Sequence, residues 1–361
     1  MPTNIGSLPT DLLFEILLRL PADHLYERVR LVCRRWYHII HSHAFINAQM
    51  HGATCGLLLS PLNDNNTLPL YVTADADGGI HTSELNHISK LGVLATCNGL
   101  VLELDDRRFP RLVNPTTKQS FLLPRGVSYA VVEYGFAYSA ASLVCKVIAQ
   151  HNVFHSPPRL QIDYGLDVLT VGVDESWRKV EDVYHLPDYV KRFFFNKAPL
   201  TSEGFLHWGR GRYCATFDVE TENITLSEVP LPHQAYLERD YFYLSTGRCL
   251  SLLVACGDLS WEVWEMKSET GEWRKALPNV ELGAEKCRIQ QFSDRALEPL
   301  GWVKYPQVLA LYFGAYYSEK QCRHCIFYNL DTHQLDSIEL PHSYSRDYDA
   351  FPHKNNLIWL S

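Results

Sequence analysis

The sequence contains no apolar run long enough to cross a bilayer. Its longest runs, residues 250–256 and 308–313, have the length of a β-strand, whereas a membrane-spanning helix needs about 20 apolar residues. Basic residues are not in excess either, because 33 Lys and Arg stand against 41 Asp and Glu, for a net charge of −8. Such a chain is not drawn to nucleic acid or anionic lipid by broad electrostatic attraction. We therefore expect neither a nucleic acid nor a membrane among its partners.

The cysteines form no disulfide framework. Ten of them are scattered from Cys33 to Cys325 without regular spacing, which in a chain of this length indicates reduced thiols and an intracellular protein. The N-terminal segment has Asp11 and Glu15 within its apolar stretch and no basic lead, so we do not expect a signal peptide. These features predict a location in the cytoplasm, the nucleus or both.

Motifs for metals, cofactors and common catalytic sites are missing as well. The tightest cysteine pair, Cys322 and Cys325, lacks the second pair that a structural zinc site needs. The segment Gly209–Gly211 lacks the third glycine and the βαβ setting of a dinucleotide-binding loop. No G-x-S-x-G and no H-E-x-x-H motif occurs. The sequence therefore predicts no catalytic residue, no metal and no cofactor.

The composition is that of a folded chain whose character changes once. Apolar residues make up 46% of the 361 residues and charged residues 20%, so the chain can bury a sizeable core, in two domains or in one large repetitive domain. Between Gln49 and Gly56, helical spacing of apolar residues gives way to short runs rich in Val, Tyr, Phe and Trp, separated by turn residues. We therefore predict a helical domain over residues 1–50 and an all-β domain over residues 51–361.

The predicted helical domain carries more apolar surface than it can bury by itself. A first helix, expected from Pro9 to about Arg19, has an apolar arc of about 240°, with only Asp11, Glu15 and Arg19 outside the arc. Further short helices are expected over residues 22–28 and 30–41. Three short helices make a poor independent core, so either a partner protein or the β domain covers the surplus.

Two motifs in this segment are more specific. The run LPTDLLFEILLRLP from Leu8 to Pro21 is followed by VRLVCRRW from Val29 to Trp36, and their order and spacing resemble the F-box over about residues 5–48. The resemblance implies a three-helix module that docks on the Skp adaptor, and through it on the cullin, of an SCF-type ubiquitin ligase. It also implies which residues form the adaptor-binding face and the core beside it: Leu8, Pro9, Leu12, Leu13, Ile16, Leu17, Val32, Cys33 and Trp36.

A strand–turn–strand pattern returns five times in the β domain. Each copy has Asp, Asn, Thr, Ser or Gly in its turn, and the copies lie at residues 111–119, 171–177, 216–223, 264–273 and 328–334. The spacing from Asn114 to Asn329 gives a period of about 54 residues, and a period of this size built from four strands is typical of a β-propeller blade. Two strand-like ends, Leu57–Val72 and Asn356–Leu360, can pair to build a sixth blade and close the ring. Six blades are therefore favoured, and seven blades or an open solenoid are the alternatives.

Several parts of the β domain resemble the F-box-associated domain of plant F-box proteins, which is a kelch-like propeller. They are TCNGLV from Thr96, VNPTT from Val113, GFLHW from Gly204, FDVET from Phe217 and WEVWEM from Trp261. The resemblance implies a propeller that binds another protein, without indicating which one.

Taken together, these features predict a non-catalytic substrate receptor whose helices bind the Skp adaptor while one propeller face holds a target protein for ubiquitination. Two alternatives stay open. One is a propeller enzyme, a glycosidase or an oxidase, because a single sequence cannot bring carboxylates together in space. The other is an F-box scaffold whose partner is not degraded. Loops rich in Tyr, His and Arg favour interfaces, and they supply the candidate target contacts: Tyr184, Tyr189, His233, Tyr236, Tyr344 and Tyr348.

Overall fold

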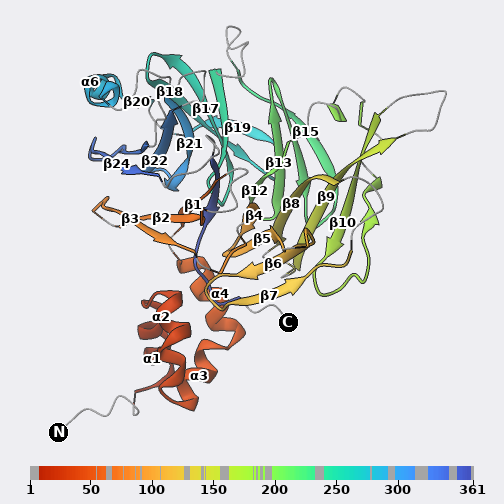
Figure 1. Ribbon diagram of the computed structural model, residues 1–361, viewed down its shortest axis with the longest axis vertical. Helices are drawn as coiled ribbons and strands as arrows, with labels where there is room; N and C mark the ends of the chain where they lie inside the picture. Colours follow the sequence, from red (N-terminus) through yellow and green to blue (C-terminus); the bar gives the residue numbers. More distant parts are fainter. Residues whose placement is uncertain are drawn as a thin grey trace.

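The structure is a computed structural model of the chain. The residues that it describes are 8–53, 55–61, 67–75, 77–85, 87–89, 92–105, 107–125, 131–139, 142, 144–154, 162–181, 183, 186–187, 190–191, 197–231, 240–276, 279–291, 297–313, 324–340 and 348–358. Within them the fold is a helical bundle followed by a β-propeller (Figure 1). No described helix is both long enough and apolar enough to span a membrane.

The bundle has four α-helices where the sequence predicted three helices. They are α1 (Thr10–Leu18), α2 (Ala22–Glu27), α3 (Arg34–Ile40) and α4 (His43–Gly52), with the 3-10 turn η2 (Val29–Leu31) before α3. The helix expected over 30–41 is interrupted at Cys33, whose backbone is extended. The additional helix, α4, begins where the hydroxyl of Ser42 accepts a hydrogen bond from the Phe45 amide, which is the usual role of serine at a helix N-terminus.

The propeller has six blades, as predicted. Blade 1 contains β25 (Tyr348–His353), β1 (Gly56–Pro61), β2 (Leu70–Ala74) and β3 (Ile80–Glu84). Blade 2 contains β4 (Val93–Cys97), β5 (Leu100–Leu104), β6 (Pro110–Asn114) and β7 (Gln119–Leu122). Blade 3 contains β8 (Val131–Ser139), β9 (Val144–Phe154), β10 (Ile162–Thr170) and β11 (Arg178–Lys179).

The other three blades follow the same order, each from its inner to its outer strand. Blade 4 contains β12 (Leu200–Ser202), β13 (Phe205–Arg210), β14 (Tyr213–Asp218) and β15 (Ile224–Glu228). Blade 5 contains β16 (Tyr241–Ser245), β17 (Leu250–Gly257), β18 (Ser260–Lys267) and β19 (Glu272–Lys275), with β20 (Val280–Glu281) paired to β18. After the short α6 (Lys286–Gln290), blade 6 contains β21 (Leu297–Lys304), β22 (Val308–Phe313), β23 (His324–Asn329) and β24 (Leu335–Glu339).

Blade 1 closes the ring with strands from both ends of the chain. Its innermost strand, β25, pairs with β1 from Gly56↔His353 to Pro61↔Tyr348. The closing strand is therefore Tyr348–His353, and the prediction that residues 356–360 supply it is wrong. Residues 356–358 run beside blade 2 instead, because the Asn114 amide donates hydrogen bonds to the Asn356 side chain at 3.1 Å and to the Ile358 carbonyl at 2.8 Å.

The repeated turn joins the two outer strands of a blade. In blade 2 the Asn114 side chain accepts hydrogen bonds from the Thr116 and Thr117 amides, and Asn329 does the same for its turn in blade 6. Four residues after each of these Asn residues the backbone has a positive φ, at Lys118 in blade 2 and at His333 in blade 6. An Asx side chain that holds the turn's backbone explains why Asn or Asp recurs at the period seen in the sequence.

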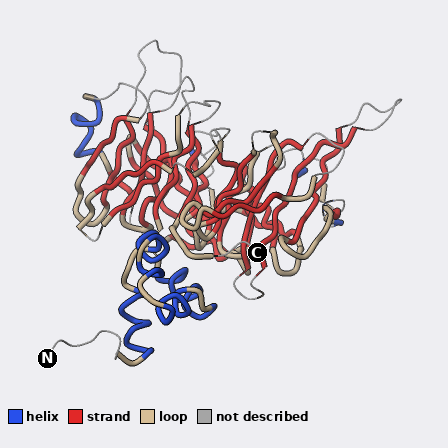
Figure 2. The backbone as a smooth tube through the Cα atoms, turned by 60° about the horizontal axis from the view of Figure 1, so that its bottom comes forward, coloured by secondary structure: helices blue, strands red, loops and turns tan. Residues whose placement is uncertain are grey.

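The helical bundle packs directly on the propeller. Leu357, in the segment after β25, is fully buried in the helical core with Leu13 and Leu17. In the other direction, Met50 of α4 is buried in the core shared by blades 2 and 3. Figure 2 shows the helices of the bundle gathered on one side of the strands. The interlocked cores fix the direction in which the bundle projects from the propeller.

Candidate functional site

The helical bundle displays an unusual amount of apolar surface. Nine large apolar side chains are well exposed in the described parts of the chain, and five of them lie within residues 12–37. We call these five the exposed apolar face, and their side chains are between 42% and 70% accessible: Leu12, Ile16, Leu31, Val32 and Tyr37. A concentration of this kind on a small unit is typical of a protein-binding surface.

The face is made by one side of α1 and by the chain that leads into α3. Leu12 and Ile16 are one helical turn apart, so they share a side of α1, while Leu13 and Leu17 turn into the core. The start of α3 is held against the start of α1, because the Arg35 guanidinium donates to the Leu8 carbonyl at 2.7 Å and to the Thr10 hydroxyl at 3.0 Å. The apolar side chains of α1 and those of the chain that leads into α3 therefore lie at the same end of the bundle.

The structure separates the residues that the sequence assigned to the adaptor-binding face. Pro9, Leu12, Ile16, Val32 and Cys33 are exposed, and Leu8 is half-buried. Leu13 and Leu17 are core residues, at most 1% exposed, and the half-buried Trp36 packs against the same core. Leu31 and Tyr37 belong to the exposed face although they were not among the predicted residues.

Little of the predicted target-binding set can be placed. Tyr184, Tyr189, His233, Tyr236 and Tyr344 lie outside the described residues. The sixth residue, Tyr348, is buried at the start of β25, where its ring meets that of Tyr312 edge-on at 6.4 Å. Its assignment to a target-binding loop is therefore wrong, because this side chain is part of the core between blades 6 and 1.

A groove lies between blades 4 and 5 of the propeller, with a volume of about 1270 Å³. Its apolar walls include Phe205 and Trp273, and the Trp273 indole N–H lacks a hydrogen-bond partner among the described residues. Arg212 and Arg274 add positive charge, and Arg274 pairs with Glu265 at 2.9 Å. Tryptophan and arginine are the residue types that contribute most to protein-binding energy.

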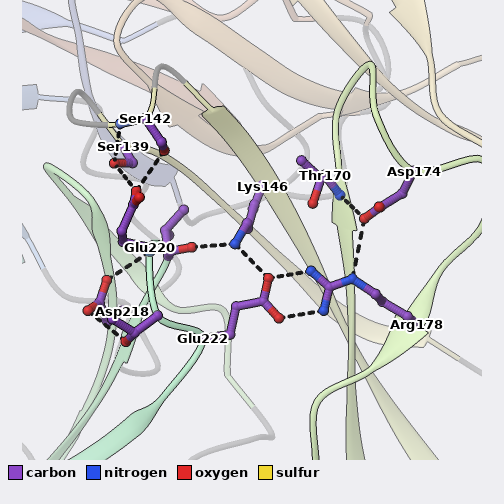
Figure 3. Close-up of polar contacts among 11 residues, drawn as sticks. Ser139, Ser142, Lys146, Thr170, Asp174, Arg178, Asp218, Glu220 and Glu222 are labelled. Atoms are coloured by element: carbon purple, nitrogen blue, oxygen red, sulfur yellow. Dashed lines mark hydrogen bonds and ion pairs between the residues drawn. The ribbon is translucent and has the colours of Figure 1, made fainter.

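Blades 3 and 4 are linked by a network of charged side chains (Figure 3). The Lys146 ammonium on β9 donates to the Val219 carbonyl at 2.6 Å and to the Glu222 carboxylate at 2.5 Å. The same carboxylate receives two hydrogen bonds from the Arg178 guanidinium at the start of β11. These donors, with Arg178 the strongest, lower the pKa of Glu222 to about 2, so the carboxylate is ionised over the whole physiological range.

The remaining carboxylates of this network are also occupied. Asp174 accepts from the Thr170 amide at 2.7 Å, and Glu220 accepts from the hydroxyls of Ser139 and Ser142 at 2.7 and 2.6 Å. These contacts lower the pKa values of both carboxyls. Both carboxylates are held in place and kept ionised, and neither has the raised pKa of a general acid.

A serine–histidine contact in blade 4 is sealed from solvent. The His207 ring lies 2.6 Å from the Ser202 hydroxyl and 3.0 Å from the Thr216 hydroxyl. All three side chains are buried, and burial lowers the pKa of His207 to about 3. Since a nucleophile must reach its substrate, this trio functions as a satisfied polar group in the core. Among the described residues, no cluster of His, Cys, Asp and Glu suits a metal ion.

Comparison with known proteins agrees with this architecture. Residues 5–47 match the family model of the F-box domain. Residues 60–287, more than half of the chain, match that of the F-box associated beta propeller domain. The chain therefore belongs to the F-box proteins with an F-box-associated propeller.

The similar curated proteins are distant relatives. An F-box/kelch-repeat protein of Arabidopsis thaliana is 26% identical over 297 residues, covering 75% of this chain and 79% of the relative. An F-box/LRR-repeat/kelch-repeat protein of the same plant is 27% identical over 243 residues, covering 65% of this chain and 62% of the relative. Among solved structures, the N-terminal domain of Nup159 aligns with 84% of this chain and 68% of its own, at 12% identity and a TM-score of 0.33.

Proposed function

We propose that this chain is the substrate-recognition subunit of an SCF-type ubiquitin ligase. In this proposal the exposed apolar face binds the Skp adaptor, which connects the chain to the cullin, and the propeller binds a target protein. The chain itself carries out no covalent step, because its contribution is to raise the local concentration of target lysines at the ubiquitin donor. We place this activity in the cytoplasm, the nucleus or both.

The observation that carries the proposal is the exposed apolar face on an F-box. Five large apolar side chains lie in a segment of 26 residues and are covered neither by the bundle nor by the propeller. Fully burying one Leu, Ile or Val side chain contributes about 1.5–3 kcal/mol, so a partner that covers the remaining exposed area gains several kcal/mol. The interlocked cores of bundle and propeller also support a receptor, since they hold a bound target in a constant direction from the adaptor.

For the target, we propose contact at the groove between blades 4 and 5. An extended segment of the target protein suits a groove that combines the indole of Trp273 with Arg212, Arg274 and the acidic Glu228. Such mixed polar and aromatic walls are typical of protein-binding surfaces.

Proximity labelling in cells tests the receptor function. A labelling enzyme is fused to the wild-type chain, to the variant Leu12→Asp/Val32→Asp, and to Trp273→Ala. We expect the face variant to lose the adaptor and retain target proteins, which then accumulate with less ubiquitin. We expect Trp273→Ala to retain the adaptor and lose those targets.

Two outcomes would contradict the proposal. If the face variant labels the adaptor as strongly as the wild type, the exposed apolar face is not the docking site. If labelled proteins keep the same abundance and ubiquitin content when the ligase is inhibited, the chain is a scaffold and not a degradation receptor.

A further inference from the structure

A second hollow lies on the propeller axis, at the mouth that faces the helices. It has a volume of about 400 Å³, and five of the six blades contribute to its wall, as does the end of α4 through His51 and Ala53. Its wall includes the turns between the first and second strands of blades 2, 4, 5 and 6, which meet around the axis of the ring. We call this hollow the axial cavity.

The axial cavity is positively charged in a negatively charged protein. Arg248, Lys304 and Lys354 line it, against a single carboxylate from Glu203. Its formal charge is therefore +2, whereas the whole chain carries −8. Three cations around 400 Å³ repel one another, and that repulsion opposes folding unless an anion offsets it.

These cations lack acidic partners in the described part of the chain. Neither Arg248 nor Lys354 has an ion pair there, and the Lys304 ammonium contacts only the Asp75 carbonyl, at 3.5 Å. Other cations of the propeller are paired, as is Lys275 with Glu262 at 2.9 Å. At the axial cavity, three cations without an ion pair among the described residues lie together.

The cavity wall also contains a buried, uncharged histidine that can form hydrogen bonds. His353, the last residue of β25, is 1% exposed and lines the cavity. Burial lowers its pKa to about 4, against a smaller raising effect of the neighbouring Asn355 side chain, so the ring is neutral at physiological pH. Neither ring nitrogen has a hydrogen-bond partner of good geometry among the described residues. Buried polar groups are normally satisfied, which points to a partner inside the cavity.

We propose that the axial cavity binds a small organic anion that carries two or more phosphate or carboxylate groups. Anionic oxygens form strong charge-assisted hydrogen bonds with Arg and Lys, and two such groups would balance the excess positive charge. The volume is that of a small-molecule site, and the end of α4 forms part of its wall. This site is separate from adaptor docking and goes beyond the receptor function.

The test uses the full-length chain, with sodium pyrophosphate and sodium citrate as probes. Thermal unfolding is followed with each probe and with sodium chloride at the same ionic strength, because a ligand that binds the native state raises the melting temperature. Calorimetric titration then gives the affinity. We expect at least one probe to stabilise the chain, and the stronger probe identifies the preferred anionic group.

Single charge removals locate the site. Arg248→Gln and Lys354→Gln each remove one cation from the cavity and relieve repulsion, so both variants should fold. Each should weaken probe binding about tenfold to a hundredfold, which is the usual effect of losing one charge-assisted hydrogen bond. Arg107→Gln removes the same charge from an exposed turn of blade 2 and should bind like the wild type.

Three results would overturn the inference. The first is that neither probe raises the melting temperature above the sodium chloride control. The second is that both cavity variants bind the probe with wild-type affinity. The third is that Arg107→Gln loses as much affinity as they do, since binding would then follow net charge and not the cavity.

Discussion

The charged network between blades 3 and 4 gives a quantitative prediction for Glu222. Its pKa falls from 4.5 to about 2 in the folded chain, which corresponds to about 3 kcal/mol of stability at neutral pH. The carboxylate is 22% exposed and Arg178 is 44% exposed, so solvent screening reduces this to about 1–2 kcal/mol. We therefore expect Glu222→Gln to lower the melting temperature at pH 7 by about 1–3 °C.

The effect of Glu222→Gln must also depend on pH. Because the folded-state pKa is lowered, the stabilisation is complete above the unfolded-state pKa near 4.5 and is lost as pH falls towards about 2. The difference in melting temperature between wild type and variant should be constant from pH 7 to about pH 5.5 and should shrink below that.

Thermal unfolding of both chains across this pH range measures the effect. Glu269→Gln serves as the control, because Glu269 is an exposed residue of the corresponding turn region in blade 5. The reasoning is refuted if Glu222→Gln melts with the wild type at pH 7, or if the difference stays the same down to pH 3.

Two further changes test other parts of the fold. Leu357→Ala should destabilise the helical bundle by about 2–5 kcal/mol, because it leaves a cavity in a fully buried core. Relative to the wild type, the variant should therefore show a larger increase in the hydrogen-exchange rate of α1 than of blade 5. An equal change in the two regions would contradict this prediction. Arg108→Gly should stabilise the chain by about 0.5–1 kcal/mol, because Arg108 is exposed with φ = 63°, a conformation that glycine adopts without steric cost. Chemical denaturation measures the second change, and a destabilised glycine variant would show that the left-handed backbone carries no strain.

The propeller could be predicted because its signal is local and repeated. In several blades an Asx side chain holds the backbone amides of the outer turn, as at Asn114, Asp218 and Asn329, so the pattern recurs along the chain. The closure of the ring, by contrast, depends on residues that are far apart in the sequence. It pairs Gly56 with His353 across almost the whole chain, and the more apolar of the two C-terminal segments, NLIWL at 356–360 compared with YDAFPH at 348–353, is not the one that pairs.

The helical bundle, too, could be predicted only in part. An apolar arc of about 240° on the first helix indicated that two faces need cover, but it could not tell which one faces outward. The structure assigns Leu13 and Leu17 to the core and leaves Leu12 and Ile16 exposed. The core side depends on Leu357, which is 340 residues away from Leu17 and cannot be paired with it by any local pattern.

The axial cavity could not be predicted from the sequence at all. Arg248 lies in a turn of blade 5, Lys304 is the last residue of β21 in blade 6, and Lys354 follows β25 of blade 1, so nothing in the local sequence relates them. Only the closing of the ring brings the three side chains to one mouth. Their positive charge is also hidden in the composition, because the chain as a whole is acidic.

The affinity of the full-length chain for a purified Skp adaptor tests the central claim most directly. It is measured by calorimetry for the wild type, for Leu12→Ala/Val32→Ala, and for Leu122→Ala/Leu226→Ala, which removes two exposed leucines from the propeller. We predict that the first variant binds about thirtyfold more weakly, from about 1 kcal/mol at each truncated contact, and that the second binds like the wild type. Equal affinities for all three chains, or an equal loss in both variants, would contradict the assignment of the exposed apolar face as the adaptor-docking surface.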